Sequence, residues 1–330
     1  MVHFQRYPAN PILQPRPHLD WEAGAVFNCG ATLDDRGRVR LLYRAVARGY
    51  RPKPRGRGYD HYISSVGLAT SQDGVHFTPQ DEPVLRPEAP WDPWGCEDPR
   101  VTRLDLGGRP TWWVTYTAML APAFSGYGNR VGLARTHDFR TFYKHGHLIP
   151  GAESKNAVLF PELHRGRVVL LHRLMPSIYI AFLPPELLWE PDVRFWEKYW
   201  ARVHEFLLME PLFPWEKRKI GAGPPPIPTD AGWVLLYHGV DEHRVYRVGA
   251  ALLDGEDPRR VLARLPEPLL APEAPYEREG DVPNVVFPTG AVVREGTVYL
   301  YYGAGDKVCA LATAPLEAIV QALRREMEHG

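Results

Sequence analysis

Short apolar runs separated by tight polar turns recur along the chain. In the first segment a run at residues 28–33 is followed by a turn at 34–37 and by further runs at 39–44 and 63–69. Equivalent pairs of runs follow at residues 98–102 and 112–116, 159–163 and 168–173, 226–229 and 233–238, and 290–293 and 298–303. Most of these pairs are joined by glycine. Each segment is therefore predicted to form a strand, a glycine turn, a second strand and usually a third.

The spacing of these segments predicts the fold class. They repeat about every 60–70 residues, which suits blades of four strands joined by long loops. The runs are rich in β-branched and aromatic residues, which favour strands over helices. We predict an all-β protein, a five-bladed β-propeller that forms a single domain over residues 1–330. A β-sandwich with coincidental repetition is the alternative.

Two segments depart from the strand pattern. Residues 191–208 carry apolar side chains at near-helical spacing and are predicted to form an inserted helix. Residues 316–328 read as an amphipathic helix that packs on the outside. The stretch at 51–57, rich in Pro, Gly and Arg, is predicted to be a loop.

Composition excludes several classes of function. Lys plus Arg and Asp plus Glu both total 39, so the net charge is zero. This balance argues against proteins that coat nucleic acids or bind membrane surfaces. The three cysteines have neither a disulfide pattern nor metal-ligand spacing, and no run approaches the length of a membrane span. We expect a cytoplasmic protein, and the sequence leaves open whether it forms a homo-oligomer.

One carboxylate stands out at the start of a predicted inner strand. In the run Cys96-Glu97-Asp98-Pro99-Arg100, Asp98 comes directly before a proline. The inner strands of propeller blades converge on the central channel, so Asp98 is a candidate catalytic acid. An aspartate that caps a turn before proline is the structural alternative. Glu97 is expected on the other face of the strand, behind the site.

Basic residues form a second candidate group. Lys155, Arg173, Lys219 and His238 come from successive segments, and Arg173 and His238 each end an apolar strand. Taken singly, each fits an exposed position. Together at one channel they would bind an anion. Arginine would donate two parallel hydrogen bonds to it, and lysine would act as a point charge. No metal site or cofactor is predicted, since the histidines lack ligand spacing.

Several longer motifs resemble glycoside hydrolase family 130. They are the runs at residues 27–31, 41–44, 96–100, 159–162, 219–226, 237–240 and 282–290. They occur in the family's order over about residues 8–315. The resemblance implies a five-bladed propeller and, for most of the family, inverting phosphorolysis of β-mannosides. The products would be α-mannose 1-phosphate and a shortened sugar, with inorganic phosphate as co-substrate.

The resemblance also implies roles for individual residues. Asp98 matches the family's catalytic acid, which is thought to pass its proton through the 3-hydroxyl of mannose. The phosphate-binding positions correspond to Lys155, Arg173, Lys219 and His238, with Tyr246 as a further candidate. The resemblance implies an arginine where this chain has Lys155. The lysine keeps the positive charge but cannot donate the two parallel hydrogen bonds of a guanidinium. The positions that hold the mannosyl unit correspond to Asn28, Arg44, Ser64 (or Ser65, one step away in register) and Asp306.

Two other functions are compatible with the same fold. A hydrolase of mannosides or arabinosides would need a second carboxylate as base, and Glu162 is the candidate. A non-catalytic sugar-binding propeller would need neither Asp98 nor the basic group. The sequence does not specify the acceptor sugar (glucose, N-acetylglucosamine or mannose), although loops at residues 50–61 and 121–129 are expected to shape its subsite.

Overall fold

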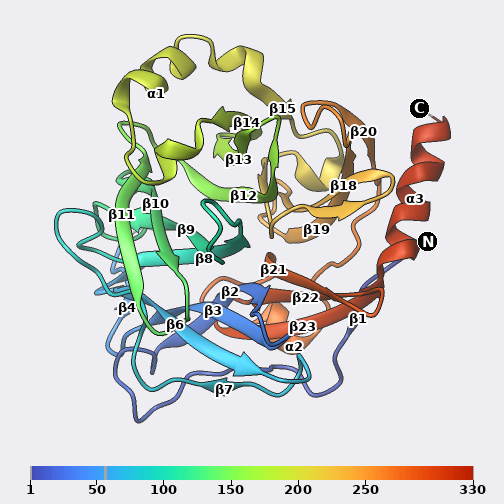
Figure 1. The fold of residues 1–330 in the computed structure, drawn as a ribbon. Helices are drawn as coiled ribbons and strands as arrows, with labels where there is room; N and C mark the ends of the chain where they lie inside the picture. The colour runs from blue at the N-terminus through green and yellow to red at the C-terminus, as the bar shows by residue number, and fades with distance from the viewer. Residues whose placement is uncertain (1, 56–57, 330) are drawn as a thin grey trace.

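The computed structural model describes residues 2–55 and 58–329 and shows five antiparallel sheets arranged around a central axis (Figure 1). We number these blades I to V from the first sheet in the chain. Blade I contains β2 (Ala25–Leu33), β3 (Val39–Val46), β6 (Ser64–Ser71) and β7 (Thr78–Pro79). Blade II contains β8 (Cys96–Arg103), β9 (Trp112–Met119), β10 (Asn129–Thr136) and β11 (Phe142–Ile149). The prediction of a five-bladed propeller is confirmed.

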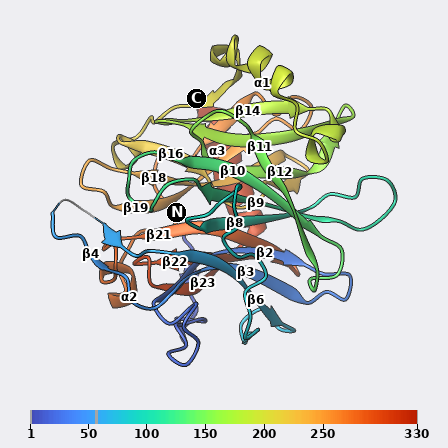
Figure 2. The ribbon, with the colours of Figure 1, turned by 90° about the vertical axis from the view of Figure 1, so that its left-hand side faces the viewer.

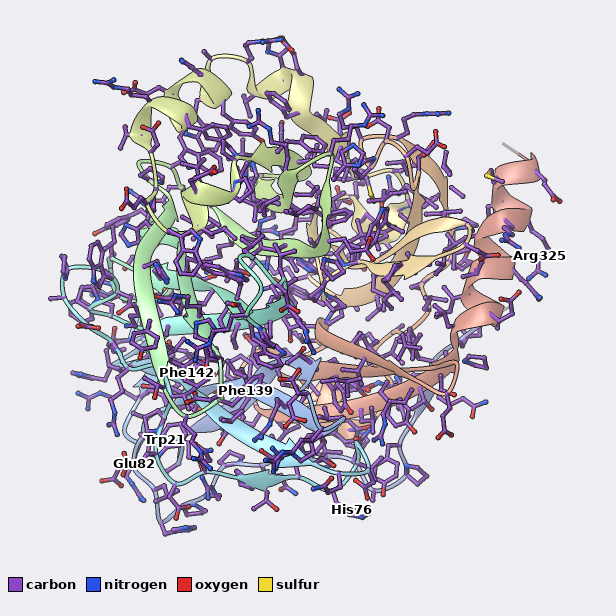
Figure 3. All side chains as sticks on the ribbon, viewed as in Figure 1. Trp21, His76, Glu82, Phe139, Phe142 and Arg325 are labelled. Carbon is purple, nitrogen blue, oxygen red and sulfur yellow. The ribbon has the colours of Figure 1, made fainter. Side chains whose placement is uncertain are left out.

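The other three blades follow the same order, with the innermost strand first. Blade III contains β12 (Lys155–His164), β13 (Arg167–Leu174), β14 (Ser177–Leu183) and β15 (Leu207–Met209). Blade IV contains β16 (Lys219–Ala222), β17 (Ile227–Thr229), β18 (Gly232–Val240), β19 (Tyr246–Leu253) and β20 (Val261–Arg264). Blade V contains β21 (Val286–Arg294), β22 (Thr297–Ala304), β23 (Val308–Pro315) and the N-terminal β1 (Gln5–Arg6). Side chains fill the space within and between the blades (Figure 3).

In four of the five blades a buried carboxylate binds both a tyrosine hydroxyl and a cationic side chain. The tyrosine lies on the second strand of its blade, and its hydroxyl donates to a carboxylate that precedes the blade's first strand. The four sets are Glu22–Tyr43–Arg16, Asp92–Tyr116–Lys144, Glu216–Tyr237–Arg264 and Glu277–Tyr302–Arg6. Breaking such a buried pair by removing one partner typically costs about 3–5 kcal/mol. We call this arrangement the acid–tyrosine–cation lock.

The locks explain part of the sequence repeat. A side chain at Gly67 would place its Cβ 2.3 Å from the ring of Tyr43, and one at Gly132 would lie 2.4 Å from Tyr116. The third strand therefore needs glycine where the tyrosine ring crosses it. The recurring runs of Val-Gly-Leu-Ala follow from this close approach.

Blade III lacks the lock and uses the inserted helix instead. His172 stands where the other blades carry the tyrosine, and its Nε2 lies 2.7 Å from the hydroxyl of Tyr199. Tyr199 belongs to α1 (Val193–Trp200), which begins after Asp192, whose side chain accepts from the backbone of Arg194. The predicted helix at 191–208 is thus too long. A 3₁₀ helix, η2 (Val203–Phe206), follows α1, and the chain then enters β15 because blade III needs a fourth strand.

The ring closes by pairing the two ends of the described chain. β1 pairs with β23, and the guanidinium of Arg6 binds the carboxylate of Glu277. The C-terminal helix α3 (Leu316–His329) lies outside the blades, as predicted (Figure 1; Arg325 marks it in Figure 3), and in Figure 2 it lies behind the strands. Its residues Ile319, Val320 and Leu323 are buried in the core shared by blades IV and V.

Short elements complete the fold. They are β4 (Arg51–Pro52), β5 (Tyr59–Asp60), α2 (Pro275–Arg278), η1 (Pro185–Leu188) and η3 (Pro214–Glu216). The loop predicted at 51–57 begins with β4, and its positions 56 and 57 lie outside the described residues. Among the described residues, no helix has the length and apolar character needed to cross a membrane.

Candidate active site

A cavity of about 290 Å³ lies where the inner strands of the blades converge. Eight of the ten predicted site residues line it: Asn28, Arg44, Asp98, Lys155, Arg173, Lys219, Tyr246 and Asp306. They come from all five blades, so the propeller brings together residues more than 270 positions apart in the chain. Ser64 and His238 do not line the cavity.

Bulges in the inner strands aim three side chains into this cavity. Asn28, Asp98 and Asn156 have positive φ angles of 50°, 51° and 54°, and each lies at a shift in strand register. A β-bulge interrupts the alternation of side chains between the two faces of a strand. Left-handed backbone is uncommon for residues other than glycine, and Asn and Asp tolerate it best.

The bulge at Asp98 corrects the prediction for Glu97. Strict alternation placed Glu97 on the face away from the site, but both carboxylates line the cavity. Glu97 is paired with two cations, because Arg44 Nη2 lies 2.5 Å from Oε1 and Lys155 Nζ lies 3.7 Å from Oε2. Glu97 thus orients two of the predicted ligand residues.

Asp98 is nearly buried and accepts from two predicted sugar ligands. Asn28 Nδ2 donates to Oδ1 at 2.7 Å, and Arg44 Nη1 lies 3.2 Å from the same atom. Burial would raise the pKa of Asp98, but the charges of Arg44, Lys155 and Arg100 outweigh it and hold the pKa below its usual value. Asp98 is therefore ionised at neutral pH in this arrangement.

The predicted anion ligands form a positive group near Asp98. Lys155 and Arg173 are register partners on β12 and β13, and Lys219 Nζ lies 5.1 Å from the centre of the Tyr246 ring. Burial and the charges of Arg173 and Lys155 lower the pKa of Lys219 to about 7. Burial also lowers the pKa of Arg173. Cations crowded in this way destabilise one another until an anion neutralises them.

His238 lies behind this group. It is fully buried, its ring stacks on Tyr246 at 6.0 Å, and neither ring nitrogen has a hydrogen-bond partner among the described residues. Burial, with the charges of Arg173 and Lys219, holds the pKa of His238 well below its usual value, so the ring is neutral. A neutral imidazole can donate only one hydrogen bond.

Asn156 is a site residue that the sequence analysis missed. It is buried, it lines the cavity, and its Oδ1 has no partner among the described residues. A Cβ on Gly221 would lie 3.0 Å from this oxygen and 2.8 Å from Nε2 of His238, so both polar atoms face the notch that glycine leaves. Its direction follows from the left-handed backbone at the bulge, which the pattern of residue types does not show.

Asp306 and Ser64 occupy different environments. Asp306 lies in the turn between β22 and β23, where burial raises its pKa to about 7 in spite of the opposing charge of Arg44. Ser64 is fully buried and forms a bridge with Gly95. Neither Ser64 nor Ser65 lines the cavity, so a sugar contact from either stays a prediction.

The cavity wall also includes one of the two loops expected near the acceptor. Residues 123–127 and 129 line it, whereas no residue of 50–61 does among those described. The described residues contain no group of three or more His, Cys, Asp or Glu side chains placed to hold a metal ion.

Comparisons with known proteins agree with this arrangement. The family model described as beta-1,4-mannooligosaccharide phosphorylase matches residues 4–325. A 1,2-beta-oligomannan phosphorylase of Thermoanaerobacter sp. (strain X514) is 37% identical over 325 residues, covering 97% of this chain and 99% of the relative. The structure of a Listeria innocua beta-1,2-mannobiose phosphorylase, in complex with beta-1,2-mannobiose, superposes with a TM-score of 0.81 at 29% identity, covering 98% and 99% of the two chains.

A further solved structure widens the range of chemistry in this group. The description of this structure states that the GH130 family of mannoside phosphorylases contains glycoside hydrolases that target beta-1,2 mannosidic linkages in Candida mannan. It superposes with a TM-score of 0.79 at 27% identity, covering 96% of this chain and 94% of the other. With a family match over nearly its whole length, this chain belongs to glycoside hydrolase family 130.

Proposed function

We propose that this protein is an inverting β-mannoside phosphorylase. It transfers a mannosyl unit from a β-mannoside to inorganic phosphate, which yields α-mannose 1-phosphate and a shortened sugar. The similar proteins named above as phosphorylases support this assignment. The three cysteines are free thiols, which fits the expected cytoplasmic location.

The positive group beside Asp98 is the observation that carries the proposal. Lys155, Arg173 and Lys219 line the same cavity as Asp98, and Glu97 offsets only part of their charge. A phosphate dianion would relieve the repulsion that depresses the pKa of Lys219. A water nucleophile would gain nothing from three cations at this place.

Inverting chemistry requires the nucleophile and the leaving group to lie on opposite faces of the mannosyl unit. A phosphate oxygen forms the new bond to the anomeric carbon while the bond to the departing oxygen breaks on the opposite face of the sugar. The departing oxygen takes the proton of Asp98, which the family resemblance routes through the 3-hydroxyl of mannose. Phosphate is already an anion, so no carboxylate base is needed.

Bound phosphate also favours the protonated form of Asp98. Without an added anion the cations keep Asp98 ionised, and an acid catalyst must carry a proton. A dianion bound against Lys155 and Arg173 offsets their charge, so it raises the pKa of Asp98. Asn28, Arg44 and Asp306 are then the residues that hold the mannosyl unit.

The hydrolase alternative lacks a well-placed base. Glu162 is exposed on β12 and does not line the cavity. Glu97 does line it, but it is paired with Arg44 and Lys155. A non-catalytic sugar-binding propeller would need neither the buried Asp98 nor the positive group, so this alternative does not account for them.

We further propose that the preferred bond is β-1,2. The similar relative from Thermoanaerobacter and the superposed Listeria structure are both named for β-1,2-linked mannosides, although the family description names the β-1,4 linkage. The test is incubation with β-1,2-mannobiose, β-1,4-mannobiose or mannosyl-glucose, with and without phosphate. Formation of α-mannose 1-phosphate only with phosphate is expected. Equal sugar release without phosphate contradicts the proposal.

A further inference from the structure

The loop between β9 and β10 supplies an exposed tyrosine to the cavity. Residues 123–127 line the cavity in an unbroken run. Tyr127 is 64% exposed, which is far above the exposure of the other tyrosines of the cavity and its surroundings. A large ring in contact with water at the wall of a sugar site can bind a further apolar surface.

The two aromatic rings of this loop are not equivalent. Phe124 packs on Tyr59 and Tyr62, with ring centroids 5.9 and 5.2 Å apart. Tyr127 makes no hydrogen bond or ring contact with any residue of the described ranges 2–55 and 58–329. Phe124 therefore fixes the loop to blade I, while the exposed ring of Tyr127 is available to a ligand.

The loop is held in place although its tip is exposed. Leu120 donates to the carbonyl of Gly128 across its base at 2.7 Å. The carboxylate of Glu153 accepts from the backbone N–H groups of Gly128 and Asn129 at 2.8 and 2.9 Å, and from Arg130 at 2.7 Å. The backbone next to Tyr127 is thus held in place, which reduces the entropy lost when a ligand orders the loop.

The chemistry places the departing sugar on this side of the cavity. The positive group that would hold phosphate comes from blades III and IV. Inversion puts the leaving group on the opposite face of the anomeric carbon. The β9–β10 loop belongs to blade II, the blade that also carries Asp98, and both Asp98 and Tyr127 line the cavity; this arrangement favours a departing sugar between them.

We propose that Tyr127 forms the wall of the subsite for the departing sugar, where its ring stacks on the C–H face of that pyranose. The proposal rests on the proposed phosphorolysis of β-mannosides and adds the residue that recognises the part of the substrate beyond the cleaved bond. Tyr127 then determines affinity for the mannoside and has no part in binding phosphate.

Two measurements test this role. The first is the KM for β-1,2-mannobiose and, separately, for phosphate in the wild type and in Tyr127→Ala, Tyr127→Phe and Tyr127→Trp. We expect Tyr127→Ala to raise the KM for the disaccharide on the order of tenfold, with the KM for phosphate unchanged. Tyr127→Phe and Tyr127→Trp keep a ring and should stay close to the wild type. Equal KM values for the disaccharide in the wild type and Tyr127→Ala overturn the proposal.

The second measurement separates this proposal from the proposed function. Calorimetric binding of β-1,2-mannobiose without phosphate needs no turnover, so it tests Tyr127 even if phosphorolysis is not found. Weaker binding by Tyr127→Ala supports the subsite, whereas unchanged binding, or no binding by the wild type, overturns it. Tyr143→Ala is the matched control, because Tyr143 is 50% exposed on the outer strand β11 and does not line the cavity.

Discussion

Arg44 and Asp98 form an ion pair in the wall of the cavity, with Nη1 of Arg44 3.2 Å from Oδ1 of Asp98. The proposed acid is therefore ionised and bound to a proposed sugar ligand before substrate arrives. Phosphate and sugar must change this pairing for Asp98 to carry a proton.

Replacing Asp98 tests the assignment of the acid. Asp98→Asn keeps the shape of the side chain but cannot supply a proton, so we expect formation of α-mannose 1-phosphate to fall about 10²–10⁴-fold. The melting temperature should show that the variant is folded. Glu162→Gln, an exposed change on β12, serves as the control. Full activity in Asp98→Asn would remove Asp98 from the mechanism.

Arg173 is expected to act on phosphate alone. Arg173→Ala removes a charged donor worth about 1.5–3 kcal/mol in a hydrogen bond, so the KM for phosphate should rise on the order of 10–100-fold. The KM for the mannoside should change much less. Arg167→Ala, at the exposed end of the same strand β13, is the matched control. An unchanged phosphate KM in Arg173→Ala would contradict its role.

Anion binding should weaken as pH rises through about 7. The pKa of Lys219 is about 7 because burial and the neighbouring cations lower it. Below that pH the lysine is already charged, and above it binding must be accompanied by proton uptake. Sulfate, whose charge is constant over this range, is a suitable probe by calorimetry between pH 6 and 9. In Lys219→Arg the charge persists, so the profile should flatten; identical profiles in both proteins would argue against Lys219.

Asp306 should make the protein less stable above neutral pH. Its pKa is raised to about 7 in the folded state against about 3.9 when unfolded. Between these values the folded state binds more protons, so stability falls as pH rises through this window. Asp306→Asn should be more stable than the wild type at pH 8, on the order of 1–3 kcal/mol, and equally stable at pH 4. Denaturant unfolding at both pH values measures this, with the exposed Asp20→Asn as control.

The strands and turns could be predicted because they are encoded locally. Alternation of residue types and glycine at hairpin turns such as Gly37 and Gly166, both with positive φ, suffice to define them. The propeller followed from the repeat, and most site residues followed from the convergence of inner strands and from the family resemblance.

The missed features depend on geometry that the pattern does not carry. The bulge that turns Asp98 inward also brings Glu97 to the cavity, and alternation alone predicted the reverse. Asn156 is polar like many loop residues, and only its left-handed backbone next to Gly221 reveals its direction. The early end of α1 reflects the demand of blade III for β15, a contact between distant segments.

The closure of blade V has a consequence for synthesis of the protein. Asn28 is among the first site residues to leave the ribosome and Asp306 among the last, and the sheet that supports Asp306 is completed by Gln5 and Arg6. A nascent chain that lacks β22 and β23 cannot form the cavity, whatever its other blades have done. Competence for the reaction should therefore appear only after β22 and β23 have been synthesised, and products that end before β22 should be inert rather than partly active.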